Sequence, residues 1–206
     1  MGFYDRHVLP RLLDAACGKS LVAAQRRKVV PMAQGVVLEV GMGSGLNLPH
    51  YDPARVSRVI GLDPGEALLA TARRRAAAGT LPVEFIPAGG EHIALDAASV
   101  DTVVVTYTLC TIPGVDQALE GMRRVLKPSG RLLFCEHGLA PDAGVAAWQR
   151  RLQPLWGRLA GGCHLTRDAG ALLEGAGFAV HWIERAYARG TPRFAGWHFI
   201  GTATPR

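Results

Sequence analysis

Residues 36–47 read VVLEVGMGSGLN, and this stretch decides the fold. An apolar, β-branched run ends in Glu39 and Val40 and passes into a loop with glycines at positions 41, 43 and 45. Such a run is typical of a strand that is buried on both faces of a parallel sheet. A glycine-rich loop at the carboxyl end of a first strand lies where an open α/β sheet binds its ligands. The stretch therefore predicts a doubly wound sheet with a ligand site at this loop.

Further apolar runs follow about every twenty residues, with helical patterns between them. We expect strands at 59–62, 83–87, 100–106 and 131–136, and helices at 66–78, 115–126 and 145–160. A short helix capped by Thr166 then precedes two closing strands, near 178–187 and 197–204, which need only a hairpin between them and are expected to be antiparallel. The fold class is thus α/β, a doubly wound, seven-stranded, mostly parallel sheet with an antiparallel C-terminal strand.

The length and the charge balance limit the classes of function. The 206 residues suit one domain, 1–206, in which residues 1–34 read as one or two helices, broken at Pro10, Gly18 and Pro31, that form a lid on residues 35–206. The net charge is +6, and the first 32 residues hold six basic against two acidic side chains. This is too little for a nucleic-acid-binding arm, so we expect no nucleic-acid partner. It suits either a solvated helix face or reversible contact with an anionic membrane surface.

The cysteines and the apolar segments make further classes of protein improbable. Cys17, Cys110, Cys135 and Cys163 show no paired spacing of the CxxC kind, so the sequence predicts neither a disulfide framework nor a metal site. No run approaches the roughly 18 apolar residues of a membrane span, and the first residues lack the pattern of a signal peptide. We therefore expect a cytoplasmic protein with reduced thiols.

Asp63 is the second chemical signal, because it closes the next strand 18 residues after Gly45. A carboxylate at this place can accept hydrogen bonds from both hydroxyls of a ribose. The loop has the spacing GxGxG, and Leu46 stands where the dinucleotide-binding fingerprint requires its third glycine. The pair of signals favours a nucleoside-containing ligand, and Leu46 counts against a nicotinamide-dependent oxidoreductase.

The order ExGxGxG and then Asp at the end of the second strand resembles the class I S-adenosylmethionine-dependent methyltransferases. RRVLKPSGRLLFCEH at 123–137 resembles the helix, turn and fifth strand of that family. More narrowly, TLC at 108–110, EHGLAP at 136–141 and GCHLTR at 162–167 resemble the membrane-anchored alkyl thiol methyltransferases. Those enzymes carry a hydrophobic N-terminal anchor, whereas this sequence begins almost directly with Tyr4, so we do not expect permanent membrane insertion.

The resemblance implies S-adenosylmethionine as the cofactor and assigns the residues that would bind it. The methionine half falls to Glu39, Gly41, Gly43, Asn47 and the backbone carbonyl of Thr106, the ribose to Asp63, and the adenine to Gly90, Glu91 and His92. Gly89 occupies the place where the family usually has an acidic residue for the adenine amino group.

His137 is our candidate for the residue that accepts the proton of the methyl acceptor, because it ends the fifth strand at the same edge of the sheet as the glycine loop. Tyr4 and His7 could close the site from the N-terminal helix. Deprotonating a thiol of pKa about 8.5 at neutral pH costs only about 2 kcal/mol, so a thiol acceptor needs no strong base.

The sequence therefore predicts methyl transfer from S-adenosylmethionine to a small, apolar acceptor, with a thiol as the first choice. A phospholipid amine or a quinone-like ring is the alternative acceptor. A regulatory module that binds the cofactor without turnover is the alternative outside enzymes. The acceptor pocket of this fold is built from variable helices, so fold analogy does not identify the acceptor.

Overall fold

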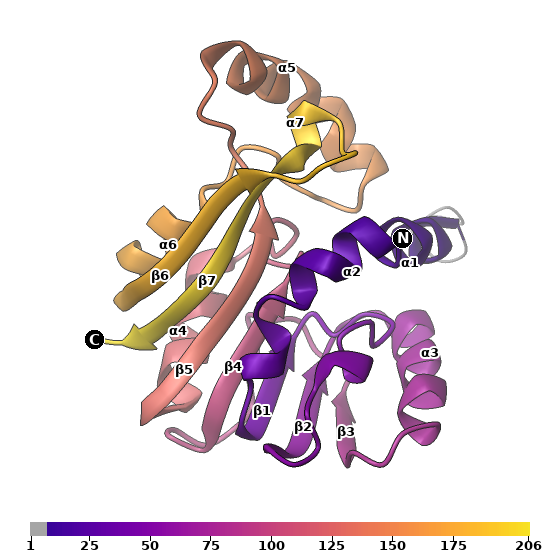
Figure 1. Cartoon of the computed structure of the whole chain (residues 1–206), viewed down its shortest axis with the longest axis vertical. Helices are drawn as coiled ribbons and strands as arrows, with labels where there is room; N and C mark the ends of the chain where they lie inside the picture. The colour runs from indigo at the N-terminus through magenta and orange to yellow at the C-terminus, as the bar shows by residue number, and fades with distance from the viewer. Residues whose placement is uncertain (1–7) are drawn as a thin grey trace.

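The computed structural model describes residues 8–206, apart from the side chains of Arg11 and Leu13, and is built around one seven-stranded sheet. The strands lie in the order β3-β2-β1-β4-β5-β7-β6 (Figure 1). Their bounds are β1 (Gly35–Val40), β2 (Val56–Leu62), β3 (Val83–Ile86), β4 (Val100–Thr106), β5 (Leu126–His137), β6 (Phe178–Tyr187) and β7 (Trp197–Pro205). Strand β7 is antiparallel to both of its neighbours, β5 and β6, while the other pairings are parallel. The predicted fold class is confirmed.

Helices cover the faces of the sheet and the edge at which β1 and β4 end. They are α1 (Leu9–Cys17), α2 (Ser20–Arg26), α3 (Glu66–Ala77), α4 (Val115–Val125), α5 (Ala143–Leu159), α6 (Ala169–Gly175) and α7 (Arg193–Gly196), with short 3₁₀ turns η2 (Val30–Met32) and η3 (Leu48–His50). In Figure 1, α1 and α2 lie above the end of the sheet where β1 and β4 finish. No helix within residues 8–206 is long and apolar enough to cross a membrane.

The central strand β1 is buried because alternate residues pack into two different cores. Leu38 and Val40 belong to the core on the face covered by α4, where Leu119 contributes. Val37 belongs to the opposite core, which includes Ala72 of α3. Because side chains of a strand alternate between faces, a strand covered on both sides requires apolar residues at successive positions, and Glu39 is the one polar residue of β1.

Two local predictions are wrong. The cap of α6 is Asp168, whose carboxylate accepts the backbone N–H of Ala171, and not Thr166. Pro10 lies in the first turn of α1, where a missing N–H costs nothing, and the residues before position 8 that would test the predicted break lie outside the described part of the chain. Strand β5 begins at Leu126 and not at 131, because Leu126 already pairs with Val100 of β4.

Candidate active site

A cleft of about 830 Å³ opens at the carboxyl ends of β1, β2 and β4. Its wall combines the glycine loop, the start of α3, the loop at 89–91, the segment 106–113 and helix α1. Of the nine predicted cofactor residues, the structure brings eight to this wall, and His92, which is exposed, is the exception. Ligands of doubly wound sheets bind at this edge because the loops of neighbouring strands diverge there.

The glycine loop needs two of its glycines for different reasons. A Cβ on Gly41 would come within 2.2 Å of the Oγ1 atom of Thr108, so this glycine lets the loop approach the turn after β4. A Cβ on Gly43, where φ is +56°, would meet no atom closer than 4.0 Å. Gly43 lines the cleft, so a side chain there would occupy space that is open to a ligand. The loop thus presents bare backbone to the cleft.

Asp63 connects the glycine loop to the start of α3. Its Oδ2 atom accepts the N–H of Gly43 and its Oδ1 atom accepts the N–H of Gly65, both at 2.8 Å. The residue is 9% exposed, and this burial raises the pKa of its carboxyl, while the two backbone hydrogen bonds oppose the increase. Each carboxylate oxygen keeps a free lone pair, so both can accept a hydrogen bond from a ligand in the cleft.

Glu39 and Asn47 form a buried polar network at the end of β1. The Nδ2 group of Asn47 donates to the Oε1 atom of Glu39 and to the Oγ1 atom of Thr106, both at 3.0 Å. The hydroxyl of Tyr51 donates to the other carboxylate oxygen of Glu39 at 2.7 Å. Burial raises the pKa of Glu39 to about 7, against the effect of these hydrogen bonds. The Oδ1 atom of Asn47 is buried and has no partner within the part of the chain that the structure describes. The site therefore lacks a hydrogen-bond donor for the Oδ1 atom of Asn47. Its burial also disfavours the ionised form of Glu39, which a nearby cation would stabilise.

The loop at 89–91 forms the opposite wall of the cleft. The Oε1 atom of Glu91 accepts the N–H of Gly114 at 3.1 Å, which fixes this side chain to the start of α4. A Cβ on Gly90 would lie 3.0 Å from the Cδ1 atom of Ile112. Gly89, Gly90 and Glu91 thus form a narrow backbone wall without bulky side chains.

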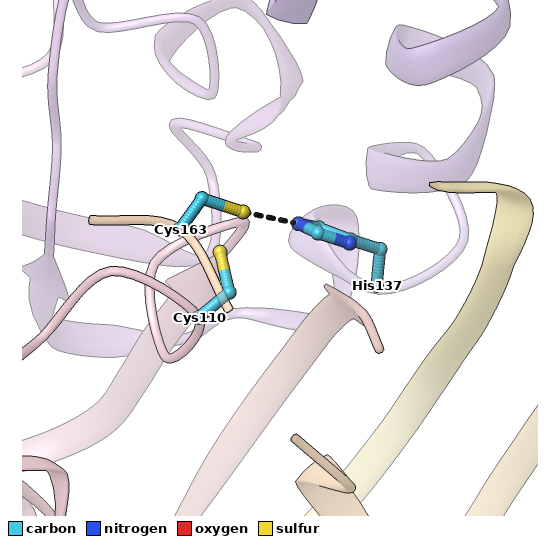
Figure 2. Close-up of side chains that lie close together, drawn as sticks. All are labelled: Cys110, His137 and Cys163. Carbon is cyan, nitrogen blue, oxygen red and sulfur yellow. Dashed lines mark hydrogen bonds between the residues drawn. The ribbon is translucent and has the colours of Figure 1, made fainter. Parts of the chain in front are cut away.

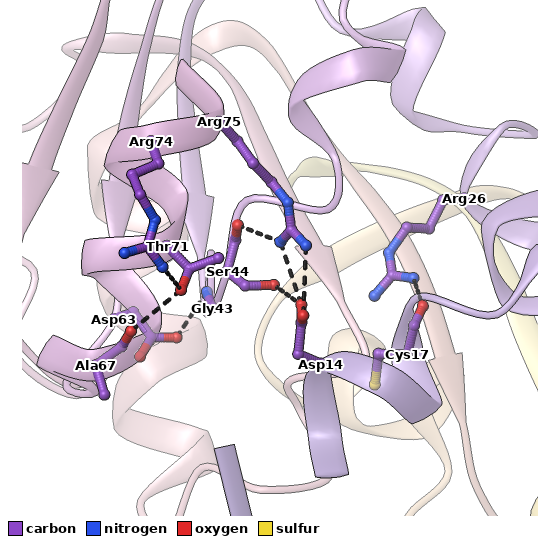
Figure 3. A network of polar contacts seen from close by, with 10 residues as sticks. All are labelled: Asp14, Cys17, Arg26, Gly43, Ser44, Asp63, Ala67, Thr71, Arg74 and Arg75. Atoms are coloured by element: carbon purple, nitrogen blue, oxygen red, sulfur yellow. Dashed lines mark hydrogen bonds and ion pairs between the residues drawn. The ribbon is translucent and has the colours of Figure 1, made fainter. Parts of the chain in front are cut away.

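Helix α1 closes the cleft through contacts that local sequence patterns do not reveal. Asp14 accepts hydrogen bonds from the hydroxyl of Ser44 in the glycine loop and from both terminal nitrogens of Arg75 in α3 (Figure 3). The side chain of Arg26, which is 4% exposed, donates to the carbonyl of Cys17 at 2.7 Å and lies 4.8 Å from the centre of the Tyr107 ring. Asp14, Cys17, Arg26 and Tyr107 all line the cleft.

Arg26 changes the interpretation of the basic N-terminal segment. Its guanidinium faces the cleft and is not a surface charge, and it has no carboxylate partner within salt-bridge distance among residues 8–206. Lys28 is also neutralised, because its ammonium lies 2.6 Å from Glu184. The segment therefore offers less positive surface than its composition suggests, and the cleft gains a buried cation. Neither fact has a signal in the local sequence, since both partners come from tertiary contacts.

Comparison with known proteins agrees with this geometry. Residues 38–134 match the profile of a family described as "Methyltransferase domain". A phosphatidylethanolamine N-methyltransferase of Cereibacter sphaeroides is 30% identical over 145 residues, which cover 68% of this chain and 70% of that protein. The chain belongs to the S-adenosylmethionine-dependent methyltransferase family.

Other relatives of this methyltransferase are named thiol S-methyltransferases. The protein TMT1B is 35% identical over 150 residues in Rattus norvegicus and 37% identical over 153 residues in Homo sapiens. The matched region covers 72% of this chain, and the chain spans about 62% of the length of those relatives. A solved complex of a Haloferax volcanii Trm112 activator and a methyltransferase has a TM-score of 0.74 at 16% identity, over 98% of this chain and 96% of that chain, which shows a shared fold.

Of the three predicted catalytic residues of the methyltransferase, only His137 belongs to the described part of the chain. Tyr4 and His7 lie outside the described residues. His137 does not line the cleft but contacts Cys163, with 3.2 Å between its Nε2 atom and the Sγ atom (Figure 2). Burial lowers the pKa of His137, but the hydrogen bond to Cys163 and the negative charge of Cys163 raise this pKa by more. The pKa of His137 therefore lies above its ordinary value. For Cys163, hydrogen bonds from Cys110 and His137 lower the pKa of the thiol although burial opposes this.

Proposed function

We propose that this methyltransferase transfers the methyl group of S-adenosylmethionine to a small, apolar acceptor, and that the acceptor is a thiol. When bound, the cofactor supplies an activated methyl group on a sulfonium. The observation that carries the proposal is the cleft at the ends of β1, β2 and β4, with bare loop backbone, a shielded carboxylate and an unpaired amide oxygen in its wall.

The residues in the cleft fit this cofactor. The unpaired Oδ1 atom of Asn47 is suited to accept a hydrogen bond from the methionine ammonium, and the same cation would favour the ionised form of Glu39. Asp63 would bind the ribose hydroxyls through its free lone pairs, and the open backbone at Gly43 would lie against the cofactor. Gly90 and Glu91 would border the adenine.

The wall nearest α1 would take the acceptor. It includes Leu9, Leu46 and Tyr107, which suit an apolar molecule. The buried guanidinium of Arg26 adds positive charge beside Tyr107, and positive charge favours a thiolate over a thiol. Since deprotonating a thiol costs only about 2 kcal/mol at neutral pH, this charge is a sufficient aid.

Helix α1 would act as the lid that keeps water away and holds the reactants in line. The contacts of Asp14 with Ser44 and Arg75 fasten the helix to the glycine loop and to α3. Correct alignment of two reactants is worth roughly 7–11 kcal/mol of the barrier. Most of the catalysis would therefore come from positioning, and a fully charged base in the cleft is not required.

The role of His137 as proton acceptor stays a prediction. His137 contacts Cys163, and the ring of Tyr107, which lines the cleft, stacks on its imidazole with 6.4 Å between the centroids, so a proton from the cleft could reach it past Tyr107. If His137 accepts the proton, the kcat/KM of a His137→Ala variant should fall by up to about thirtyfold near pH 7. This deficit should vanish as the pH rises through the pKa of the thiol, and a deficit that is constant from pH 6.5 to 9.5 would refute the assignment.

A phospholipid amine or a quinone-like ring is the second candidate acceptor. Weaker relatives are named phosphatidylethanolamine N-methyltransferase and demethylmenaquinone methyltransferase. The exposed side chains of Leu12 and Leu21 on α1 and α2 would support reversible contact with a membrane surface during such a reaction. The cytoplasmic location expected from the sequence is likewise a proposal.

The test is the formation of S-adenosylhomocysteine by purified protein with a panel of thiols, amines and phenols. We expect product with hydrophobic thiols, and far less with the Asp63→Ala variant at a cofactor concentration near the dissociation constant of the wild type, so this variant controls for contaminating enzymes. Product only with amines or phenols would refute the thiol assignment. Binding of S-adenosylmethionine without product from any acceptor would favour the regulatory module.

A further inference from the structure

Three potential metal ligands meet beside the cleft although they are far apart in the sequence. Cys110 follows β4, His137 ends β5, and Cys163 lies in the loop between α5 and α6. The two sulfur atoms and one ring nitrogen lie within 4.8 Å of one another. Figure 2 shows the three side chains close together. Both cysteines are buried and neither is in a disulfide. The described part of the chain holds no second cluster of this kind.

The backbone around the cluster is fixed by hydrogen bonds. The N–H of His164 donates to the carbonyl of Cys110 at 2.8 Å, which joins the two loops that carry the cysteines. The side chain of Gln153 donates to the carbonyl of Cys163 at 3.0 Å and accepts the N–H of Leu165 at 2.7 Å. The three side chains are therefore held together by α5 and the sheet and do not depend on a bound ligand for their approach.

The turn that carries Cys110 is held from its other side as well. The carboxylate of Glu136 accepts the N–H groups of Thr108 and Leu109 at 2.8 and 3.2 Å. Arg167 donates to the carbonyls of Leu109 and Ile112. A site whose ligands are positioned by such surrounding bonds loses little entropy when it binds an ion.

We propose that Cys110, His137 and Cys163 bind a zinc ion. Two thiolates and a neutral imidazole are ligands that Zn²⁺ prefers, and the two thiolates balance its charge. Bond lengths of about 2.3 Å to sulfur and 2.0–2.1 Å to nitrogen place tetrahedral ligands under about 4 Å apart, so the cluster needs only a small contraction. Three protein ligands leave a fourth position, as in zinc sites that exchange a ligand.

The fourth ligand is a thiolate, and two sources can supply it. One is Cys17 of α1, which lines the cleft and is not in a disulfide. The other is the acceptor thiol, and this source rests on the proposed function. Zinc stabilises a bound thiolate, so the ion would prepare the acceptor for methylation. His137 would then hold the ion and would not accept a proton.

The test is metal binding by the full chain, reduced and freed of metal with a chelator, without S-adenosylmethionine or acceptor. We expect one equivalent of Zn²⁺ by mass spectrometry of the metal, and a charge-transfer band from thiolate to metal on titration with Co²⁺. Loss of a residue that only hydrogen-bonds to a metal ligand lowers metal affinity about 10–100-fold. Loss of a ligand itself should cost at least as much, so we expect at least this decrease for Cys110→Ser, Cys163→Ser and His137→Gln. Cys135→Ala is the matched control, because Cys135 is a buried thiol in the core that includes Val37 and Ala72 and does not belong to the cluster. It should bind as tightly as the wild type.

The proposal would be overturned if the metal-free protein, with all four thiols reduced and titratable, binds no Zn²⁺. Equal binding of Zn²⁺ by the Cys110→Ser and Cys135→Ala variants would also overturn it. Circular dichroism of each variant separates loss of a ligand from loss of the fold. Weaker binding by Cys17→Ser assigns the fourth position to Cys17. Unchanged binding, with a cobalt spectrum that shifts when a thiol substrate is added, assigns it to the acceptor. A tetrahedral cobalt spectrum that changes neither in the Cys17→Ser variant nor on addition of a thiol substrate would refute the assignment of a thiolate to the fourth position. Because these measurements need no turnover, their failure differs from failure of the proposed function.

Discussion

Replacement of Asp63 gives the sharpest test of the cleft. The carboxylate is 9% exposed, and each of its oxygens already accepts one backbone N–H at 2.8 Å. The residue therefore has two tasks, since it shapes the glycine loop through Gly43 and would bind two ribose hydroxyls. Asp63→Asn keeps one acceptor oxygen and loses the charge, whereas Asp63→Ala loses both acceptors.

The expected loss follows from the number of bonds removed. A hydrogen bond to a charged group contributes about 1.5–3 kcal/mol, and 1.4 kcal/mol is tenfold in affinity. Loss of one such bond predicts a dissociation constant for S-adenosylmethionine that is about tenfold higher in Asp63→Asn. Loss of two predicts an increase of about a hundredfold or more in Asp63→Ala, with further loosening of the loop at Gly43 and Gly65.

Calorimetry with S-adenosylmethionine measures these constants, and thermal unfolding monitors the fold. Asp101→Asn is the matched control, because Asp101 also accepts a backbone N–H, from Val36 at 2.8 Å, and pairs with Lys127 at 2.7 Å, but does not line the cleft. This control should lower the melting temperature and leave the affinity unchanged. Equal affinities for the wild type and both Asp63 variants would refute the placement of the ribose.

Three further predictions concern the same cleft. Gly43→Ala, which puts a methyl group into the cleft at a φ of +56°, should weaken cofactor binding by about tenfold or more, whereas Gly144→Ala, where a Cβ meets no atom within 4 Å, should leave calorimetric affinity unchanged. Asp14→Ala removes a pair that is about one-third exposed, so we expect a cofactor KM only about threefold higher and an unchanged melting temperature; the same rise in Arg73→Ala would contradict a specific link to α1. Since the pKa of Glu39 is about 7 in the fold and 4.5 when unfolded, the folded state holds the extra proton between these values, so this carboxyl contributes stability below pH 4.5 that is lost as pH rises to about 7. Between pH 4.5 and about 7, the melting temperature of the wild type should therefore fall relative to that of the Glu39→Gln variant. Parallel pH profiles of the two melting temperatures would exclude the effect.

The glycine loop and the strands around it were predictable because their signals are local. A strand covered on both faces must be largely apolar, and a loop that exposes backbone must lack side chains, as Gly43 shows. Asp63 follows its strand directly, so its place at the sheet edge depends only on the strand direction. The cap of α6 was less predictable, because Thr166 and Asp168 have the same local chemistry and only the observed bond to Ala171 distinguishes them.

By itself the sequence therefore determined the sheet and the ligand edge, since each depends on a short window of the chain, and the resemblance carried by its motifs pointed to eight residues that line the cleft. Only the tertiary structure decided that Arg26 turns into the cleft, that α1 is fastened by Asp14, and that Cys110, His137 and Cys163 meet. The sheet order places β4 beside β5, and the loop after α5 returns over their ends, so side chains separated by 26 or more residues become neighbours. Spacing rules for metal sites detect ligands on one turn or hairpin, and no such rule describes ligands that two loops and the end of a strand bring together.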